Sequence, residues 1–182
     1  MPVKRELSRT MRKKIELDKI YLDMDGVLAD FERGVREMCG FEAEKTQDED
    51  PARDELMWAE IKKIDHFYSK LEPLPGAKEL FDLIYGKYGE KCEILTGIPK
   101  ARRGIKHSAE DKTEWVRRIL SETVKVNTVF KAEKKNFVAG KGSVLIDDLE
   151  KTIIEWRKSG GTGILHTDPE STLAQLKELG LL

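Results

Sequence analysis

Short apolar runs alternate with longer amphipathic runs along most of this chain. Five short runs have the length and apolar content of buried strands, over residues 20–22, 92–95, 124–130, 144–146 and 162–165. Between and after them, apolar residues recur at three- and four-residue spacing. This spacing predicts helices over residues 77–88, 109–120, 134–139, 150–159 and 170–179. The alternation predicts an α/β fold with a parallel sheet and right-handed crossovers.

Local sequence signals agree with two of these helix ends. Gly160-Gly161 follows the fourth predicted helix, where a left-handed cap is expected. Asp168-Pro169 precedes the last one, with Asp as the capping residue and Pro in the first turn.

Residues 30–75 interrupt the alternation. No strand pattern occurs there, the stretch is largely helical, and a polar break falls at residues 44–51. A crossover between parallel strands needs only a dozen or so residues, so this one is far longer than required. We interpret it as a small helical cap inserted after the first strand; a long crossover with an extra surface helix is the alternative. The expected division is a core of residues 19–29 and 76–182 with a cap of residues 30–75.

Composition narrows the class of protein. The 182 residues suffice for one domain with a sizeable core, and 33 basic against 34 acidic residues give a net charge of −1. This balance disfavours nucleic acid or an anionic membrane as a partner. No apolar run approaches a membrane span, and the N-terminus lacks a signal-peptide core. Two distant cysteines, Cys39 and Cys92, suggest reduced thiols. We expect a cytoplasmic protein and leave a homodimer open.

Residues 1–18 are rich in Lys and Arg. A loosely docked helix before the first strand is the favoured interpretation of this basic arm, because no aromatic or glycine-rich pattern accompanies the charge. A nucleic-acid-binding arm is the alternative.

Polar residues follow several predicted strands directly. Asp23 and Asp25 follow the first strand, Thr96-Gly97 the second, and Asp147-Asp148 the fourth, while Lys112 begins a helix. The carboxyl ends of parallel strands meet at one edge of a sheet, so these residues can converge there. Each residue type alone is common on solvated surfaces or at helix caps. Their joint occurrence in this order predicts an active site.

This set of residues suits a phosphate ester. Asp23 can attack phosphorus as a carboxylate nucleophile, and Asp25 can protonate the leaving alcohol and then deprotonate water. Asp23 and the Asp147-Asp148 pair offer the oxygen ligands that Mg²⁺ prefers. The Thr96 hydroxyl, the Gly97 N–H and the Lys112 ammonium can hold phosphate oxygens.

Three stretches carry a resemblance to a known family. They are residues 23–31 (DMDGVLADF), 71–77 (LEPLPGA) and 110–116 (EDKTEWV). With Thr96 and Asp147-Asp148 they resemble the motifs of the haloacid dehalogenase-like phosphohydrolases. Within that superfamily the chain is most similar to the 5′(3′)-deoxyribonucleotidases. The resemblance spans about residues 20–166.

This resemblance implies a Rossmann-like core, a helical cap and a bound Mg²⁺. The metal would be held by the Asp23 carboxylate, the Asp25 main-chain carbonyl and Asp148 directly, with Asp147 acting through water or neighbouring contacts. Phe31 would stack on the base of the substrate; packing between cap and core is its alternative role. Two positions depart from the family pattern: Leu149 replaces a basic residue, and the second motif reads TGIP.

The leading functional hypothesis is a Mg²⁺-dependent phosphomonoesterase that acts on deoxyribonucleoside monophosphates. A phosphatase of the same chemistry for a sugar phosphate or a nucleic-acid 3′-phosphate end is the first alternative. A non-catalytic binding module with the same fold is the second, and the intact set of acidic residues disfavours it.

Overall fold

A five-stranded parallel sheet forms the centre of the protein. The computed structural model describes residues 15–43 and 50–182. The strand order is β3-β2-β1-β4-β5, and every neighbouring pair is parallel. The strands are β1 Lys19–Leu22, β2 Cys92–Ile98, β3 Lys125–Phe130, β4 Ser143–Asp147 and β5 Thr162–Leu165. The predicted α/β class is therefore confirmed.

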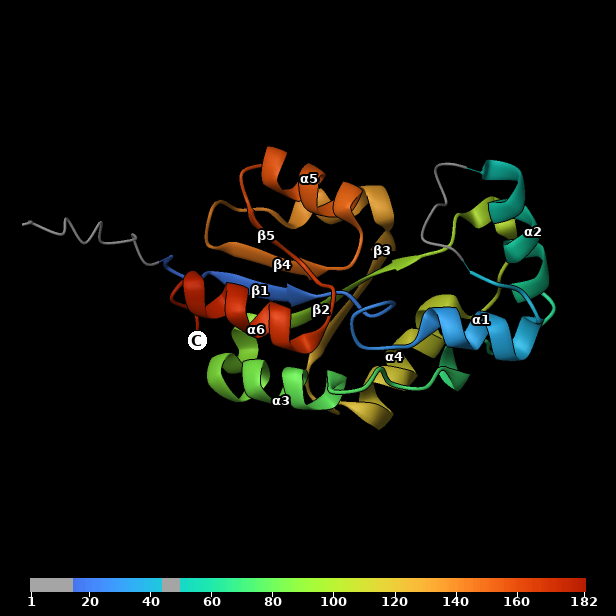
Figure 1. Cartoon of the computed structure of the whole chain (residues 1–182), viewed down its shortest axis with the longest axis horizontal. Helices are drawn as coiled ribbons and strands as arrows, with labels where there is room; N and C mark the ends of the chain where they lie inside the picture. Colours follow the sequence, from blue (N-terminus) through green and yellow to red (C-terminus); the bar gives the residue numbers. More distant parts are fainter. Residues whose placement is uncertain (1–14, 44–49) are drawn as a thin grey trace, which may run out of the picture.

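Helices cover both faces of this sheet, as Figure 1 shows. The helices α3 (Ala77–Tyr88), α4 (Ser108–Ile119) and α6 (Pro169–Glu178) lie on one face. On the other face lie α5 (Glu150–Lys158) and the 3₁₀ segment η4 (Lys131–Phe137). Successive strand residues point to opposite faces, so Leu22 packs in the larger apolar cluster and Tyr21 in the smaller one with Trp156.

Two predicted elements differ from the observed ones. The second strand does not end at Leu95, because Gly97 and Ile98 continue the ladder opposite Val129 and Phe130. Residues 134–139 do not form the predicted α-helix: the chain makes a 3₁₀ segment over Lys131–Phe137, which fits a short connector better than a full α-helix. Asp168 caps α6 as predicted, accepting the Ser171 N–H at 2.8 Å.

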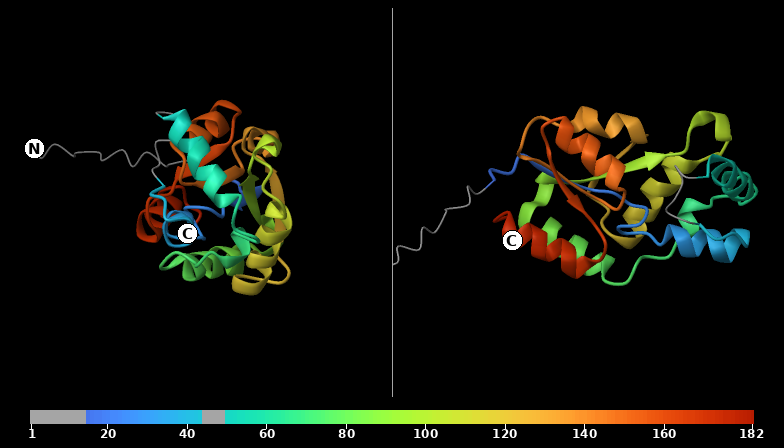
Figure 2. Two further views of the ribbon diagram at one scale, coloured as in Figure 1. Left: turned by 90° about the vertical axis from the view of Figure 1, so that its right-hand side faces the viewer. Right: turned by 45° about the horizontal axis from the view of Figure 1, so that its top comes forward.

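A helical insertion, which we define as residues 30–75, separates β1 from α3. Its described elements are α1 (Phe31–Cys39), α2 (Pro51–Ile61) and η1 (Tyr68–Lys70). In Figure 2, α1 and α2 lie beyond the carboxyl ends of the strands. Asp30 and Asp50 cap the two helices through the N–H groups of Arg33 and Arg53, each at 3.0 Å.

The return of the insertion to the core is hydrogen-bonded to the loop after β1. The Leu74 N–H donates to Leu28 O at 2.9 Å, and the Asp30 N–H donates to Glu72 O at 2.8 Å. The Trp115 indole N–H donates to Leu71 O at 2.7 Å. The LEPLPGA stretch therefore fastens both ends of the insertion beside the first aspartates.

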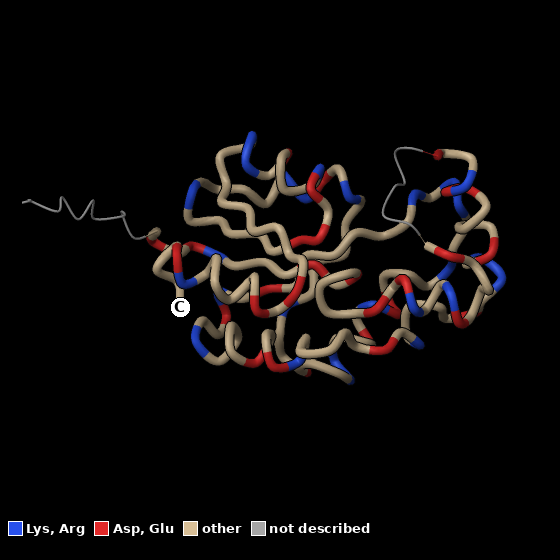
Figure 3. The backbone as a smooth tube through the Cα atoms, in the orientation of Figure 1, with Lys and Arg blue, Asp and Glu red and all other residues tan. Residues whose placement is uncertain are grey.

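Charge is distributed over both parts of the molecule. In Figure 3, both Lys or Arg and Asp or Glu are scattered over the core and the insertion alike. Among the described residues no helix is long and apolar enough to cross a membrane. Residues 1–14 of the basic arm and residues 44–49 of the polar break lie outside the described residues.

Candidate active site

A tight loop after β1 carries the first two aspartates. The Asp23 N–H donates to Ile146 O at 2.9 Å, which fixes Asp23 beside the end of β4. Met24 O accepts the N–H groups of Leu28 and Ala29, both at 2.8 Å, so the loop closes on itself. Gly26 has φ +76°, a conformation that glycine adopts without the steric cost of a side chain. Both carboxylates therefore leave the strand end from a fixed turn.

Lys112 is fully buried and joins three elements. Its Nζ donates to Asp25 Oδ2 at 2.6 Å, to Thr96 Oγ1 at 3.0 Å and to Gly97 O at 2.8 Å. An ammonium has three N–H donors, so these acceptors use all of them. The phosphate-binding role predicted for Lys112, Thr96 and Gly97 stays a prediction; in this arrangement the Lys112 ammonium holds the Asp25 carboxylate.

A second buried lysine, Lys134 of η4, lies between two aspartates. Its Nζ is 2.9 Å from Asp23 Oδ1 and 2.7 Å from Asp147 Oδ2. Burial alone would lower the pKa of Lys134, but Asp147 and Asp23 outweigh that effect and raise it. Asp147 Oδ2 accepts one of its three N–H donors and Asp23 Oδ1 lies at ion-pair distance, so a further donor can face a bound phosphate.

Sequence reasoning did not identify Lys134. Three lysines occur at positions 131, 134 and 135, and nothing in the local pattern says which one turns inward. Its place just before the strand that carries Asp147 was the only available signal.

Three carboxylates form a candidate metal centre. Asp23, Asp147 and Asp148 each offer an oxygen, and these oxygens lie within 4.8 Å of one another. The donors are all oxygen, which suits a hard divalent cation such as Mg²⁺ or Ca²⁺. Asp147 already accepts from Lys134 and from the Leu149 N–H at 2.9 Å. Both oxygens of Asp147 are thus already engaged by the protein.

The environment of Asp25 favours its protonated form. Burial is the largest cause that raises the pKa of Asp25, and the neighbouring Asp23 adds to it; Lys112 opposes both. While Oδ2 is held by Lys112, Oδ1 is buried and has no hydrogen-bond partner in the part of the chain that is described. This oxygen can carry a proton toward a leaving group.

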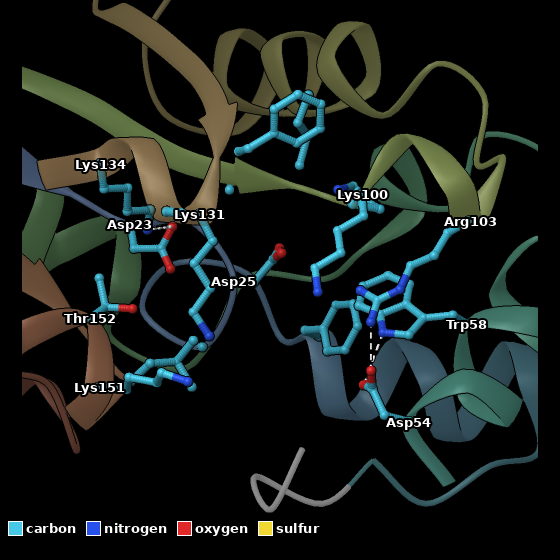
Figure 4. A pocket seen from close by; sticks show the side chains of 18 of the residues that line it. Asp23, Asp25, Asp54, Trp58, Lys100, Arg103, Lys131, Lys134, Lys151 and Thr152 are labelled. Carbon is cyan, nitrogen blue, oxygen red and sulfur yellow. Dashed lines mark hydrogen bonds and ion pairs between the residues drawn. The ribbon is translucent and has the colours of Figure 1, made fainter. Parts of the chain in front are cut away.

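A cavity of about 880 Å³ connects the aspartates with the insertion. Asp23, Asp25, Asp148 and Lys134 line one end, and Phe31, Trp58 and Tyr68 line the other. Figure 4 shows Asp23 and Lys134 at the first end and Trp58 with Arg103 at the second, with Asp25 between them. The cavity wall does not include Lys112, Thr96 or Asp147. These residues contact the lining residues or their partners from the protein interior.

The structure thus brings together every residue that the sequence singled out. Asp23, Asp25, Gly97 and Phe31 face one cavity, and Thr96, Lys112 and Asp147 support it. Phe31 also packs against other aromatic side chains of the insertion, with ring centroids 5.9 Å from Trp58 and 5.7 Å from Phe67. These contacts lie within the insertion, and the role of Phe31, base contact or packing between cap and core, stays a prediction.

A parallel sheet with carboxylates at the ends of its central strands and a helical insertion after the first strand defines a haloacid dehalogenase-like hydrolase fold. Known structures agree. The chain resembles a haloacid dehalogenase-like family hydrolase from Streptococcus pneumoniae with a TM-score of 0.54, 11% identity, and coverage of 87% of this chain and 90% of that one. It resembles a Lactobacillus plantarum protein, provisionally named a phosphoglycolate phosphatase, with a TM-score of 0.52, 14% identity, and coverage of 90% and 99%. At this identity the similarity shows the fold alone.

Sequence comparison places the chain in one particular family within this fold class. Residues 17–175 match the family of 5′ nucleotidase, deoxy (Pyrimidine), cytosolic type C proteins, and the chain belongs to that family. It is 28% identical over 143 residues to a Vibrio phage KVP40 protein with the provisional name 5′(3′)-deoxyribonucleotidase, a match that covers 76% of this chain and 71% of the relative. The chain is accordingly a phosphomonoesterase of the 5′-nucleotidase type, with a small phosphate ester as substrate.

Proposed function

We propose that this enzyme is a Mg²⁺-dependent 5′(3′)-deoxyribonucleotidase that hydrolyses deoxyribonucleoside monophosphates through an aspartyl-phosphate on Asp23. One observation carries the proposal. A cavity that holds Asp23 and Asp25 at one end is walled by Phe31, Trp58 and Tyr68 at the other. Carboxylates serve phosphoryl transfer, and an aromatic wall suits a nucleobase.

The reaction takes two displacements at phosphorus. In the first, an Asp23 carboxylate oxygen forms a bond to phosphorus while the bond from phosphorus to the deoxyribose oxygen breaks. Protonated Asp25 gives its proton to that leaving oxygen. In the second, Asp25 takes a proton from water, the water oxygen bonds to phosphorus, and the bond to Asp23 breaks. Inorganic phosphate leaves and the Asp23 carboxylate is restored.

The two buried lysines have separate tasks in this scheme. Lys134 offsets the negative charge of Asp23 as the dianionic phosphate approaches, and its remaining N–H can bind a phosphate oxygen. Lys112 keeps the Asp25 carboxyl turned toward the leaving group. Asp23, Asp148 and the Asp25 main-chain carbonyl would hold Mg²⁺, with Asp147 in support. Bound there, the ion would neutralise phosphate charge as a Lewis acid.

The other predictions extend this proposal. Residues 30–75 would act as a cap over a core of residues 19–29 and 76–182, because the aromatic end of the cavity comes from the insertion. A cytoplasmic location is consistent with two free cysteines, Cys39 and Cys92.

A substrate panel tests the proposed function. Purified enzyme would be assayed with ribo- and deoxyribonucleoside monophosphates carrying 5′ or 3′ phosphate, with Mg²⁺ and with a chelator. We expect the highest kcat/KM for deoxyribonucleotides and loss of turnover on chelation. A preference for sugar phosphates or for oligonucleotides with a 3′-phosphate end would select the first alternative. Absence of turnover on all of them, and on a generic aryl phosphate, would select a binding module.

A further inference from the structure

The loop that follows β2 crosses from the core to helix α2 of the insertion. It forms the 3₁₀ segment η3 (Ala101–Arg103) only a few residues after Thr96 and Gly97. Arg103 reaches α2 and places Nη2 2.5 Å from Asp54 Oδ2. The strand that carries Thr96 is thus joined by a short loop to the far end of the cavity.

Asp54, Trp58 and Arg103 contact one another in a set that we call the clasp, and Arg103 Nη2 also lies 3.4 Å from Glu55 Oε1 at its edge. The Trp58 indole N–H donates to Asp54 Oδ1 at 2.9 Å, and Arg103 Cζ lies 4.3 Å from the centroid of the Trp58 ring. Asp54 therefore uses one oxygen for each partner, and the guanidinium covers a face of the indole. The position of Trp58 depends on a residue from the core.

The clasp is mostly buried, and one of its polar atoms lowers the stability of the fold. The Arg103 and Asp54 side chains are each only 11% exposed. Arg103 Nε is buried and has no hydrogen-bond partner among the described residues, which opposes stability. A contact that only held the insertion in place would be better served by apolar packing. This loss of stability is understandable if the clasp positions side chains that line the cavity.

A row of aromatic contacts continues from the clasp to the catalytic end. Phe31 lies 5.9 Å from Trp58 and 6.4 Å from Tyr68, measured between ring centroids. Lys112 Nζ, which holds Asp25, lies 4.4 Å from the centroid of the Tyr68 ring. Trp58, which Figure 4 shows beside Arg103 and Asp54, is thus the end of a continuous aromatic wall rather than an isolated side chain.

We propose that Arg103 is a specificity-determining positioning residue, which fixes Trp58 through the clasp and so sets the affinity of the cavity for substrates that carry a base. This inference rests on the proposed function for the identity of the substrate. Without Arg103, the Trp58 indole loses the cation on its face, and Asp54 loses the partner that holds its carboxylate in position. Binding of a base is lost, while the sites for the sugar and phosphate remain.

Two substrates and three variants test this role. Thymidine 5′-monophosphate and 2-deoxyribose 5-phosphate share a leaving group and differ by the base. Arg103→Ala removes the clasp, and Asp54→Asn weakens it while retaining the size of the side chain. Arg102→Ala is the matched control, because Arg102 is the adjacent arginine and borders the same cavity but pairs with Glu55 rather than Asp54, with side chains 61% and 44% exposed.

The readout is the ratio of KM for the sugar phosphate to KM for the nucleotide. We expect Arg103→Ala to lower this ratio about tenfold, through KM of the nucleotide rather than kcat, since base binding does not change during the reaction. Asp54→Asn should lower it in the same direction, and Arg102→Ala should keep the wild-type ratio. Equal increases of KM for both substrates would indicate a merely structural role and overturn the proposal, as would an equal effect of Arg102→Ala.

Arg103→Lys guards against a folding defect in the alanine variant. Lysine retains the charge opposite Asp54 but has no planar group to cover the indole, so the ratio should again fall. Thermal unfolding of each variant identifies those that fold. Any folded variant of Arg103 that keeps the wild-type ratio contradicts the proposal.

A failure of the proposed function would be recognised separately. If the wild type hydrolyses no nucleotide in this assay, the proposed function is wrong, and calorimetric titration with thymidine then decides the inference. Binding by the wild type that Arg103→Ala loses supports the role of the clasp. Equal binding by both proteins, or none by the wild type, overturns it.

Discussion

The carboxylate of Asp148 occupies the space that a side chain at Gly26 would need. A Cβ added at Gly26 would lie 2.2 Å from Asp148 Oδ2 and 2.5 Å from its Cγ. The glycine after the first aspartates therefore does more than permit a turn. It lets a carboxylate from the end of β4 approach the loop after β1, and this approach assembles the candidate metal centre.

Gly26→Ala should abolish most activity. The new methyl group would force Asp148 away from Asp23, and φ +76° is unfavourable for alanine. We expect kcat/KM to fall at least about a hundredfold and the concentration of Mg²⁺ needed for half-maximal rate to rise.

Gly40→Ala is the matched control for that change. Gly40 caps α1 with φ +64°, but nothing lies within 4 Å of an added Cβ. Both variants should lose about 1 kcal/mol of stability from backbone strain, and only Gly26→Ala should lose activity. Equal activities in the two variants would show that the approach of Asp148 is unimportant.

Asp23→Asn should remove the nucleophile without unfolding the protein. Lys134 keeps its contact with Asp147, so the buried ammonium stays paired. We expect kcat to fall by at least about a thousandfold in steady-state assays of the purified variant. Asp30→Asn is the control, because the Asp30 side chain caps α1 and asparagine also caps helices. Turnover by Asp23→Asn at the wild-type rate would exclude a covalent mechanism.

Lys134→Met should destabilise the enzyme. Its removal leaves Asp23 and Asp147 buried without their cation, a change that typically costs about 3–5 kcal/mol. Chemical denaturation should show this loss, whereas Lys135→Met, at an exposed neighbouring position, should be close to the wild type. Added Mg²⁺ should raise the melting temperature of Lys134→Met more than that of the wild type, because the ion replaces the missing positive charge. Equal shifts would argue against a cation site at these carboxylates.

His66 should make stability depend on pH. It follows α2, its Nδ1 lies 2.7 Å from Asp111 Oδ1 of helix α4, and its ring stacks on His107 with centroids 4.9 Å apart. The hydrogen bond and the charge of Asp111 raise the pKa of His66 above its usual value, with Asp65 and Glu114 adding to the effect. The stabilisation is therefore fully present below about pH 6.5 and is lost as pH rises through the raised pKa.

The melting temperature measured from pH 5.5 to pH 8 checks this dependence. We expect it to decline over that range more steeply in the wild type than in His66→Asn. Asparagine tolerates the left-handed conformation of this position, φ +52°, but does not titrate. Parallel curves for the two proteins would refute the role of His66.

The alternating pattern of the chain was sufficient to predict the sheet, most helices and the edge at which Asp23, Asp25, Thr96 and Asp147 meet. These features are local: strand residues show their burial in their composition, and parallel strands present all their carboxyl ends on the same side. Where the pattern was ambiguous, the prediction was wrong. The glycine at position 97 concealed the continuation of β2, and residues 131–137 have too little periodicity to separate a 3₁₀ segment from an α-helix.

The partners of the buried charges depended on the folded chain. Lys134 and Lys135 are equivalent in sequence, yet one is buried between two aspartates and the other is exposed. Arg103 meets Asp54 only because the loop after β2 and helix α2 cross. Periodicity encodes which side of an element faces inward, but the group that a buried charge meets is set by how distant segments pack. The amino-acid pattern thus specified the sheet, most of its helices and the strand ends that carry the aspartates. Packing decided which groups the buried lysines contact, the close approach of Asp148 to Gly26, and the clasp.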